Sequence, residues 1–447
     1  MKASLQENTP IQGFTTLSSI AVMVGIVVGI GIFRLPPIVA SNSANEFQFI
    51  SFWIAGGFIS LMGALCYAEL ASSKPDAGGE YHFLSRAFGP PIGFLFTWGR
   101  MTVIQTGSLA LIAFILGDYA ALILDIGPHS SAVYAALTII ILTGLNLFGT
   151  TPSRRIQNLL TGLIIVMMIL LSLSGLISAE SLPELSESNT NSGWSLFSGG
   201  SAGAAMIFVL LTYGGWNEAA YLSGELQDVK RNMMKVLLFG ILIITFIYVL
   251  INSAYLRVLG LESLQNSETV GADLANQIFG PEGTIIVTFI VVATALSTAN
   301  ATIITGARTN YALGRDFSLL SFLGKWNSKN NTPVNALIVQ GVIALLLVGL
   351  GAWSQEAVTT MVDYTAPVFW LFLLLTTATL FIFRFRQGKK ELPFRVPLYP
   401  LTPILFLIAC GYMLYSSLAF TGSGALVGVA ILAVGVPVYL LARNREG

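Results

Sequence analysis

The stretch Val28-Gly29-Ile30-Gly31-Ile32-Phe33-Arg34-Leu35-Pro36-Pro37 interrupts an apolar segment that runs from about residue 14 to residue 40. The segment is long enough to cross a lipid bilayer, since about 20 apolar residues suffice. Its glycines and prolines weaken the helical hydrogen-bond ladder, and backbone groups freed at membrane depth are tolerated only where they face protein or a wet cavity. A helix broken there offers backbone polar groups and two helix ends to a ligand, which is typical of secondary transporters.

The composition excludes an ordinary soluble domain. Apolar residues make up 54% of the 447 residues, only 10% are charged, and the mean hydropathy is +0.77. Such values are typical of a chain that crosses a membrane many times. We expect twelve membrane-spanning segments, at residues 14–40, 47–72, 91–124, 131–149, 156–178, 201–226, 234–258, 283–312, 334–352, 358–384, 400–420 and 423–442.

The charged residues are distributed asymmetrically, although the net charge is zero. If the N-terminus is cytoplasmic, every Lys and Arg except Arg34, Arg100 and Arg257 falls in a cytoplasmic loop, helix end or tail, whereas the outer loops are acidic. This asymmetry follows the positive-inside rule. We therefore expect an integral protein of the plasma (inner) membrane with both termini in the cytoplasm. The lipid bilayer is an expected partner, and nucleic acid is not.

A second interruption, Leu211-Thr212-Tyr213-Gly214-Gly215-Trp216-Asn217-Glu218, lies in the segment predicted at 201–226. That segment comes five spans after the first and crosses in the opposite direction. Glycine-broken helices at corresponding places in two halves indicate an inverted repeat; close helix packing is the alternative explanation of a glycine pair. The predicted divisions are a cytoplasmic tail (1–13), a first five-helix repeat (14–178), a second, inverted five-helix repeat (201–384) and two accessory helices (400–442).

Residues that carry other chemistry are sparse. His82 and His129 stand alone, and Cys66 and Cys410 lie in apolar segments, where small buried hydrophobes are expected. The sequence contains no Walker-type phosphate loop, which argues against ATP-driven pumping. It also contains no catalytic constellation of the kind that would indicate an enzyme. A channel would need a continuous polar path or charged rings. We therefore expect no catalytic residue and no cofactor, apart from sodium or a proton as coupling ion.

Several motifs along the chain are expected to act together. They are Gly29–Phe33, Pro75–Tyr81, Trp98 with Gln105–Ser108, Tyr213–Asn217, Asn300 and Phe394–Pro397. We interpret the Pro75–Tyr81 turn as structural, with substrate contact as the alternative. In this order the motifs resemble the amino acid–polyamine–organocation superfamily, and within it the L-type amino acid transporters. The resemblance implies an all-α polytopic membrane protein of twelve helices, with the five-plus-five inverted repeat of the bacterial leucine transporter, discontinuous helices 1 and 6, and alternating access.

An amino acid zwitterion needs partners for its carboxylate and its ammonium group. Amide N–H groups at a helix N-terminus suit the carboxylate, and the unpaired carbonyls near the two breaks suit the ammonium. Glycine at these places lets the ligand approach the backbone. Side-chain selectivity is expected from the third, sixth and eighth segments. The predicted substrate-binding residues are Val28, Gly29, Ile30, Gly31, Ile32, Gln105, Leu211, Thr212, Tyr213, Gly214 and Asn300.

Charged residues at membrane depth are functional by default, and two pairs of them are candidates for gates. In sodium-coupled transporters of the same fold, an Arg of the first helix and an Asp of the tenth form an outer gate. The resemblance therefore predicts that Arg34 and Asp363 close over the substrate; a static ion pair is the alternative. Arg100 and Glu218 are predicted to pair below the site as an inner gate or proton relay, unless Glu218 attracts cationic substrates.

The sequence departs from the family pattern at several places. Ile30 stands where a small hydroxyl residue is common, and Leu211 where an aromatic lid is common. Ile164 occupies the place of a lysine found in the fifth segment of many relatives. Heteromeric members bind a heavy subunit through an outer-loop cysteine, and the loop at 125–131 has none. We therefore expect no disulfide-linked heavy subunit.

A sodium ion is a candidate coupling ion. Carbonyls of Gly25 and Val28 with the hydroxyls of Thr298 and Thr302 would form an all-oxygen site, which suits a hard cation. The alternative is that the two hydroxyls bond carbonyls of their own helix. The missing lysine leaves the position open to a cation.

The function predicted from these features is secondary transport of small or medium neutral L-amino acids, by exchange or by cation-coupled symport. Few acidic residues lie at cavity depth, which favours a neutral substrate. The alternatives are a carrier of cationic amino acids or polyamines and, outside transport, an amino acid sensor, although the tails are too short for a signalling domain.

Overall fold

The computed structural model describes residues 16–74, 78–149, 154–178, 200–218, 228–327, 329–330, 332–354, 356–387, 392–419 and 423–443. Over these ranges the chain is helical and forms no strand longer than a single bridge. The predicted tail 1–13 lies outside the described residues. In chain order the helices are α1 (Thr16–Val27), η1 (Ile30–Phe33), α2 (Pro36–Ser41), α3 (Glu46–Ser73), α4 (Gly79–Phe88), α5 (Pro90–Gly99), η2 (Arg100–Ile104), α6 (Gln105–Ala121), α7 (Ser130–Leu147), α8 (Arg154–Ser178), α9 (Gly200–Thr212), α10 (Val229–Gln265), α11 (Val270–Asp316), η5 (Ser318–Leu320), α12 (Val334–Ser354), α13 (Ala357–Gln387), α14 (Leu401–Ala419) and α15 (Ser423–Arg443).

Among the described residues, ten helices are long and apolar enough to cross a membrane. They are Glu46–Ser73, Pro90–Ala121, Ser130–Leu147, Leu159–Ser178, Arg231–Gln265, Pro281–Asp316, Val334–Ser354, Ala357–Arg386, Leu401–Ala419 and Gly424–Arg443. Two shorter apolar stretches, Ser19–Phe33 and Ala202–Thr212, stand at the two breaks. Each predicted segment thus coincides with an apolar helix, while the count of twelve crossings and the inverted repeat stay predictions.

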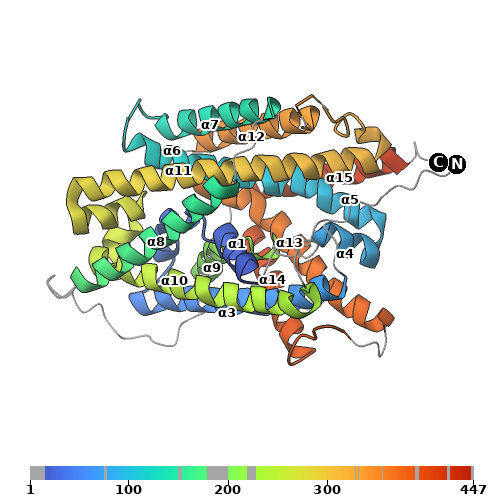
Figure 1. Cartoon of the computed structure of the whole chain (residues 1–447), viewed down its shortest axis with the longest axis horizontal. Helices are drawn as coiled ribbons and strands as arrows, with labels where there is room; N and C mark the ends of the chain where they lie inside the picture. Colours follow the sequence, from blue (N-terminus) through green and yellow to red (C-terminus); the bar gives the residue numbers. More distant parts are fainter. Residues whose placement is uncertain are drawn as a thin grey trace.

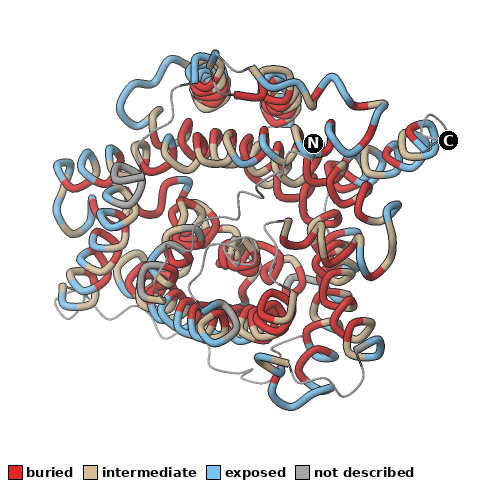
Figure 2. Tube along the Cα trace, turned by 45° about the vertical axis from the view of Figure 1, so that its right-hand side comes forward, coloured by how far each residue is buried: buried red, intermediate tan, exposed pale blue. Residues whose placement is uncertain are grey.

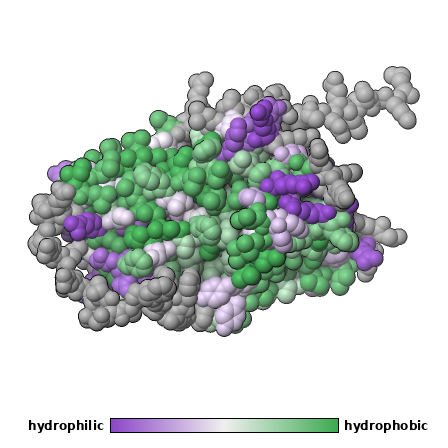
Figure 3. All heavy atoms as spheres, turned by 90° about the horizontal axis from the view of Figure 1, so that it is seen from below, coloured by the Kyte–Doolittle hydropathy of each residue, from purple (hydrophilic) through white to green (hydrophobic). Residues whose placement is uncertain are grey.

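The outer surface of the bundle is apolar. Large side chains such as Phe246, Phe289 and Leu346 are more than half exposed, and Figure 3 shows a face on which hydrophobic side chains predominate. An apolar surface of this extent is unfavourable in water and is covered when lipid surrounds it. The chain is therefore an integral membrane protein.

The two short helices α1 and α9 lie in the middle of the bundle (Figure 1). α1 packs against α8 and α10, while α9 packs against α2, α3 and α14. Figure 2 shows that the helices at the centre of the molecule are largely buried. The pair α7 and α12 lies side by side at one edge. The longer helices thus form a frame around the two elements that carry the breaks.

Two glycines interrupt the helical backbone of the long helices α10 and α11. Gly260 in α10 has a φ of 75°, and Gly280 in α11 has a φ of 71° and is followed by Pro281. Glycine adopts positive φ at little cost, and proline cannot continue the hydrogen-bond ladder of the preceding turn. The chain therefore turns at both points, which agrees with the predicted segments 234–258 and 283–312.

A buried carboxylate ties three distant parts of the chain together. Glu69 near the end of α3 is 2% exposed and makes two hydrogen bonds of 2.6 Å with Arg384 of α13. Its Oε2 also accepts a hydrogen bond of 2.6 Å from the backbone N–H of Val396. The guanidinium of Arg384 lies 3.7 Å from the ring centre of Tyr399. This cluster fixes the segment before α14 to the ends of α3 and α13.

Candidate functional site

The first break lies between α1 and η1. Gly29 has extended backbone (φ −97°, ψ −168°), and its N–H donates to the carbonyl of Val27 at 2.7 Å. The 3-10 helix begins at Ile30, and the first N–H groups of a helix have no acceptor within that helix. The N–H groups of Ile30 and Gly31 therefore form a helix N-terminus suited to an anion. The predicted interruption of the first segment is confirmed.

The second break follows the end of α9 at Thr212. The N–H of Gly214 donates to the carbonyl of Leu211 at 2.9 Å, and Gly215 has a φ of 104°. The chain leaves the helix at the predicted glycine pair because glycine adopts such a φ without strain. Residues 219–226 of the predicted segment lie outside the described residues.

The side chain of Tyr213, which is predicted to contribute to selectivity, packs against α3 and α10. It is fully buried and its hydroxyl donates to the carbonyl of Trp53 in α3 at 3.0 Å. The ring packs against Trp53 and against Tyr248 of α10, with centroid separations of 6.4 and 5.0 Å. Gly56 of α3 leaves room for it, since a Cβ there would lie 3.2 Å from the ring. The Tyr213 side chain thus serves helix packing.

The two breaks meet at Tyr248 of α10. Its buried hydroxyl lies 2.8 Å from the carbonyl oxygen of Val27 and 3.0 Å from that of Thr212, the last residues of α1 and α9. A Cβ built on Gly31 would lie 3.9 Å from Cγ2 of Thr212. The carbonyls expected to be unpaired at the breaks therefore have partners: the Tyr248 hydroxyl donates to one of the two at a time, and the Val27 oxygen also accepts from the N–H of Gly29. The role of Tyr248 could not be predicted from the sequence, since a single tyrosine in an apolar helix carries no distinctive signal.

We expect Tyr248→Phe to lower the apparent affinity for substrate by roughly tenfold, because losing a hydrogen bond to a buried carbonyl costs about 1–3 kcal/mol. Uptake into liposomes at a series of substrate concentrations would measure it. Tyr255→Phe on the same helix is the matched control, since its hydroxyl reaches the carbonyl of Ile32 only at 3.4 Å. Equal affinity of Tyr248→Phe and wild type would contradict the bridging role.

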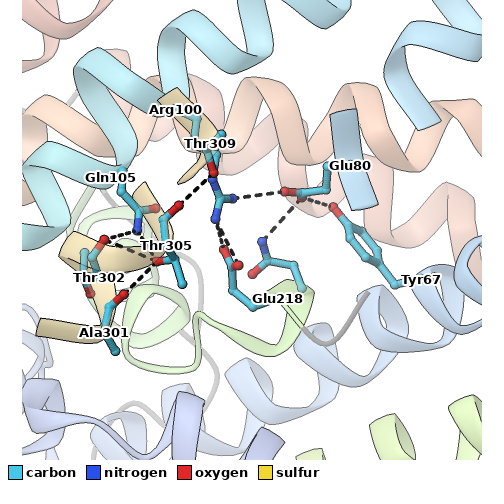
Figure 4. Close-up of polar contacts among 10 residues, drawn as sticks. Tyr67, Glu80, Arg100, Gln105, Glu218, Ala301, Thr302, Thr305 and Thr309 are labelled. Atoms are coloured by element: carbon cyan, nitrogen blue, oxygen red, sulfur yellow. Dashed lines mark hydrogen bonds and ion pairs between the residues drawn. The ribbon is translucent and has the colours of Figure 1, made fainter. Parts of the chain in front are cut away.

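A cluster of charges lies where the π-helix η2 follows α5 (Figure 4). Nη2 of Arg100 is 2.9 and 3.0 Å from the two carboxylate oxygens of Glu218, the pair predicted from the sequence. Nη1 of Arg100 is 3.8 Å from Oε2 of Glu80 in α4. The other oxygen of Glu80 accepts hydrogen bonds from the hydroxyl of Tyr67, at 2.5 Å, and from the amide of Asn217, at 3.4 Å.

Glu80 was assigned a structural role in the sequence analysis, and the structure adds it to the charged cluster. Its side chain is 5% exposed and that of Arg100 is 7% exposed. Burial raises the pKa of the Glu80 carboxyl, and the neighbouring carboxylate of Glu218 adds to this, against the opposing effects of Arg100, Tyr67 and Asn217. The motif that contains Glu80 drew attention to this turn, but only the fold reveals its partners.

Gln105 lies between the charged cluster and α11. Its Nε2 donates to the carbonyl of Thr302 and to the hydroxyl of Thr305, both at 3.1 Å. Thr305 belongs to the membrane-spanning helix α11 and contacts Gln105 of α6, and its side chain is nevertheless exposed. Figure 4 shows Gln105 and Thr305 near the Arg100–Glu218 pair. Gln105, which is predicted to bind substrate, therefore adjoins a polar, accessible part of α11.

The hydroxyls predicted to bind sodium bond their own helix. Thr298 donates to the carbonyl of Thr294 at 3.0 Å, and Thr302 to that of Thr298 at 2.9 Å. A hydroxyl that donates in this way keeps lone pairs for a cation, so the oxygen set of the sodium prediction remains chemically suitable. Beside α1, a Cβ on Gly25 would overlap the methyl group of Thr161 in α8, so these two helices approach closely there.

Asn300 lies in the interface between α7 and α11. Its Oδ1 accepts a hydrogen bond of 2.6 Å from Nδ2 of Asn146, and both residues are buried. The structure therefore places Asn300 in a polar link between helices.

Arg34 is paired with a different aspartate from the one predicted. Its Nε is 2.9 Å from Oδ2 of Asp118 in α6, and the hydroxyl of Ser131 in α7 donates to the other oxygen of Asp118 at 2.6 Å. Asp363 instead lies against the start of α15, where a Cβ on Gly424 would be 3.2 Å from its own Cβ. The predicted Arg34–Asp363 pair is not formed because Asp118 is the carboxylate within reach of Arg34.

Together, these features define a class of protein: a helical membrane protein in which two discontinuous helices meet and an ion pair lies beyond them on each side. Arg100 and Asp118 belong to the same spanning helix, Pro90–Ala121, so the two pairs lie roughly 27 Å apart along it, at about 1.5 Å per residue. Backbone groups suited to a zwitterion thus lie between two charged clusters.

The chain belongs to the amino acid permease family, whose sequence model matches residues 14–438. It is similar to the b(0,+)-type amino acid transporter 1 of Mus musculus, with 30% identity over 407 residues that cover 89% of this chain and 81% of the relative. The large neutral amino acids transporter small subunit 2 of Homo sapiens is 28% identical over 435 residues, which cover 95% of this chain and 79% of the relative. The family and these relatives are transporters, so the chain is a transporter rather than an enzyme.

Proposed function

We propose that this chain carries small or medium neutral L-amino acids across the plasma (inner) membrane by alternating access. The observation that carries the proposal is the meeting of the two breaks. Helix N-terminal N–H groups lie at Ile30 and Gly31, and the carbonyl oxygens of Val27 and Thr212 both lie within 3.0 Å of the Tyr248 hydroxyl. A carboxylate and an ammonium on one carbon would find matching partners there. Both relatives named above are amino acid transporters, which supports the same substrate class.

The charges around the breaks favour a neutral substrate over a cationic amino acid or a polyamine. Glu218, the acidic residue expected to attract a cation, already makes two hydrogen bonds with Arg100. The side chains that flank the first break are the apolar Val28, Ile30 and Ile32, each at most 3% exposed. A cationic side chain would lose hydration there without gaining a carboxylate partner.

Alternating access is proposed to use the two ion pairs as gates. Arg100 with Glu218 would close the end that we propose to be cytoplasmic, and Arg34 with Asp118 would close the other end. Each pair joins a break to the third predicted segment, so breaking it lets the interrupted helix move relative to the frame. Sodium or a proton would couple the movement, with the oxygens of Gly25, Val28, Thr298 and Thr302 as the candidate sodium ligands.

We propose further that the chain works without a disulfide-linked heavy subunit. The sequence has two cysteines, and Cys66 and Cys410 are both fully buried within the bundle. A buried thiol is out of reach of a thiol on another chain. Transport by the purified single chain is the direct test.

The experiment is uptake of labelled neutral amino acids into liposomes that contain the purified protein, with a sodium gradient, with choline instead, and with or without internal amino acid. Uptake that demands sodium would indicate a symporter and support the oxygen site. Uptake that ignores sodium but demands internal amino acid would indicate an exchanger. Uptake of arginine or putrescine in place of neutral amino acids would contradict the proposed substrate, and binding without uptake would indicate a sensor.

A further inference from the structure

We propose that Glu80 is a proton-binding residue, which takes up a proton when Arg100 pairs with Glu218 and releases it when Arg100 turns to Glu80 instead. The ligand is a proton, and its site is the cluster of Glu80, Arg100, Glu218 and Tyr67. This inference rests on the proposed function, because it assigns a coupling or regulatory ion to the gate beside the substrate site.

The geometry places one guanidinium between two carboxylates. Arg100 makes a close pair with Glu218, at 2.9 Å, and a longer contact with Glu80, at 3.8 Å. The longer separation exceeds a hydrogen bond, so in this conformation Glu218 holds the arginine. Glu80 comes from α4, whereas Glu218 follows the second break, so the two carboxylates belong to parts of the chain that alternating access would separate.

The net charge of the cluster favours the binding of a proton to one of its carboxylates. With both glutamates ionised, the side chains of Glu80, Arg100 and Glu218 carry a net charge of −1, in a place where the arginine and Glu80 are almost completely buried. Burying a carboxylate whose countercharge is taken by another group favours its neutral form. This agrees with the raised pKa of Glu80, for which burial is the main cause and Glu218 a further one.

The two oxygens of Glu80 have different surroundings. Oε1 accepts hydrogen bonds from Tyr67 and Asn217, whereas Oε2 faces Arg100. A proton on Oε2 would leave the bonds to Oε1 in place and would end the competition of Glu80 for the guanidinium. Losing this proton would make Oε2 a second acceptor for Arg100.

Charged groups on the neighbouring elements are engaged in contacts of their own. Glu69 of α3 is bonded to Arg384 of α13, and Arg386 of α13 donates to the carbonyls of Arg86 and Ala87. Three other titratable groups near α4 also have contacts of their own. They are Tyr81, whose hydroxyl is 3.2 Å from Asp316 of α11, Lys74 of α3, which lies over the ring of Phe383, and His82, whose ring contacts that of Phe83.

The exchange of Arg100 between Glu218 and Glu80 follows from the free-energy cost of leaving a buried arginine unpaired. Removing one partner from a buried ion pair costs several kcal/mol, so when the second break carries Glu218 away, an ionised Glu80 stabilises Arg100 in the open gate. When the gate closes again, Glu218 recovers the arginine and Glu80 becomes neutral. Below the raised pKa, Glu80 is protonated and the closed gate is favoured; as pH rises through that pKa, Glu80 ionises and opening is favoured.

The test measures opening directly. Thr309 of α11 is only partly exposed and lies beside Arg100, so Thr309→Cys reports the gate when a water-soluble maleimide labels the full chain in detergent. At each pH, the labelling rate of the Thr309→Cys protein is divided by that of the double variant Thr309→Cys, Glu80→Gln. This ratio removes the pH dependence of the thiol reaction itself. We expect this ratio to rise about tenfold between about pH 5 and pH 8. A ratio that stays constant would overturn the proposal.

A second variant covers the case in which Glu80→Gln fails to fold. Tyr67→Phe removes a hydrogen bond that favours the ionised carboxylate, so it should shift the midpoint of the labelling curve to higher pH; an unchanged midpoint would overturn the proposal. Glu262→Gln, at an exposed carboxylate of α10, should leave the curve unchanged. Labelling needs no substrate, so failure of amino acid uptake would contradict the proposed function and leave this result standing.

Discussion

Replacing Gly31 by alanine is expected to reduce amino acid uptake by at least tenfold while leaving the folded protein intact. In the structure, a Cβ on Gly31 would lie 3.5 Å from Cδ1 of Leu35 and 3.9 Å from Cγ2 of Thr212, which are ordinary van der Waals distances. The backbone of Gly31 is not at positive φ, so alanine brings no strain. Any loss therefore reflects the ligand rather than the fold.

The size of the effect follows from the hydrogen bonds at stake. A methyl group on Gly31 would stand between the substrate carboxylate and the N–H groups at the start of η1. A hydrogen bond to a charged group contributes about 1.5–3 kcal/mol, which corresponds to roughly a 10- to 150-fold change in affinity. Losing one such bond thus accounts for the expected reduction.

The measurement compares uptake and thermal unfolding for Gly31→Ala and for Gly349→Ala. A Cβ on Gly349 of α12 would meet no atom within 4 Å, so this control adds a methyl group away from both breaks. Gly31→Ala should unfold at the wild-type temperature and lose uptake, whereas Gly349→Ala should match the wild type in both. Undiminished uptake by Gly31→Ala would remove the first break from the substrate site.

The two breaks could be predicted because their signals are local. Gly29, Gly31 and the Gly214–Gly215 pair disfavour a continuous helix through their own backbone properties, whatever surrounds them. The Arg100–Glu218 pair could be predicted for a related reason, since charges at membrane depth need partners and each residue lies about one turn from its break or polar face. In both cases the property belongs to a few neighbouring residues.

The remaining parts of the site depend on packing between distant segments. Tyr248 is separated by 221 residues from Val27, whose carbonyl it binds, and Glu80 by 137 residues from Asn217. For Arg34 the predicted partner is Asp363, and no prediction concerns Asp118. The resemblance favoured Asp363, whereas the helix packing brings Asp118 within 2.9 Å. A polar residue in an apolar helix reveals that it needs a partner, but only the fold selects the partner.

Replacing Glu69 by alanine is expected to destabilise the protein by about 3–5 kcal/mol, the usual cost of removing one member of a buried ion pair. Glu69 is 2% exposed, and its carboxylate accepts three hydrogen bonds of 2.6 Å, two from Arg384 and one from the N–H of Val396. Alanine would leave the guanidinium and the N–H without this acceptor. The midpoint of thermal unfolding in detergent should fall clearly below that of the wild type.

A double-mutant cycle separates the ion pair from simple loss of packing. Replacing both partners of a buried pair by groups without charge is much less harmful than replacing one, so Glu69→Gln with Arg384→Gln should be more stable than Glu69→Ala. Equal losses in the single and double variants would show that the side-chain volume, and not the charge pair, matters. If the pair does matter, it joins the end of α3, which precedes Glu80, to the end of α13, and the proposed gate would then move against a part of the frame that is held together.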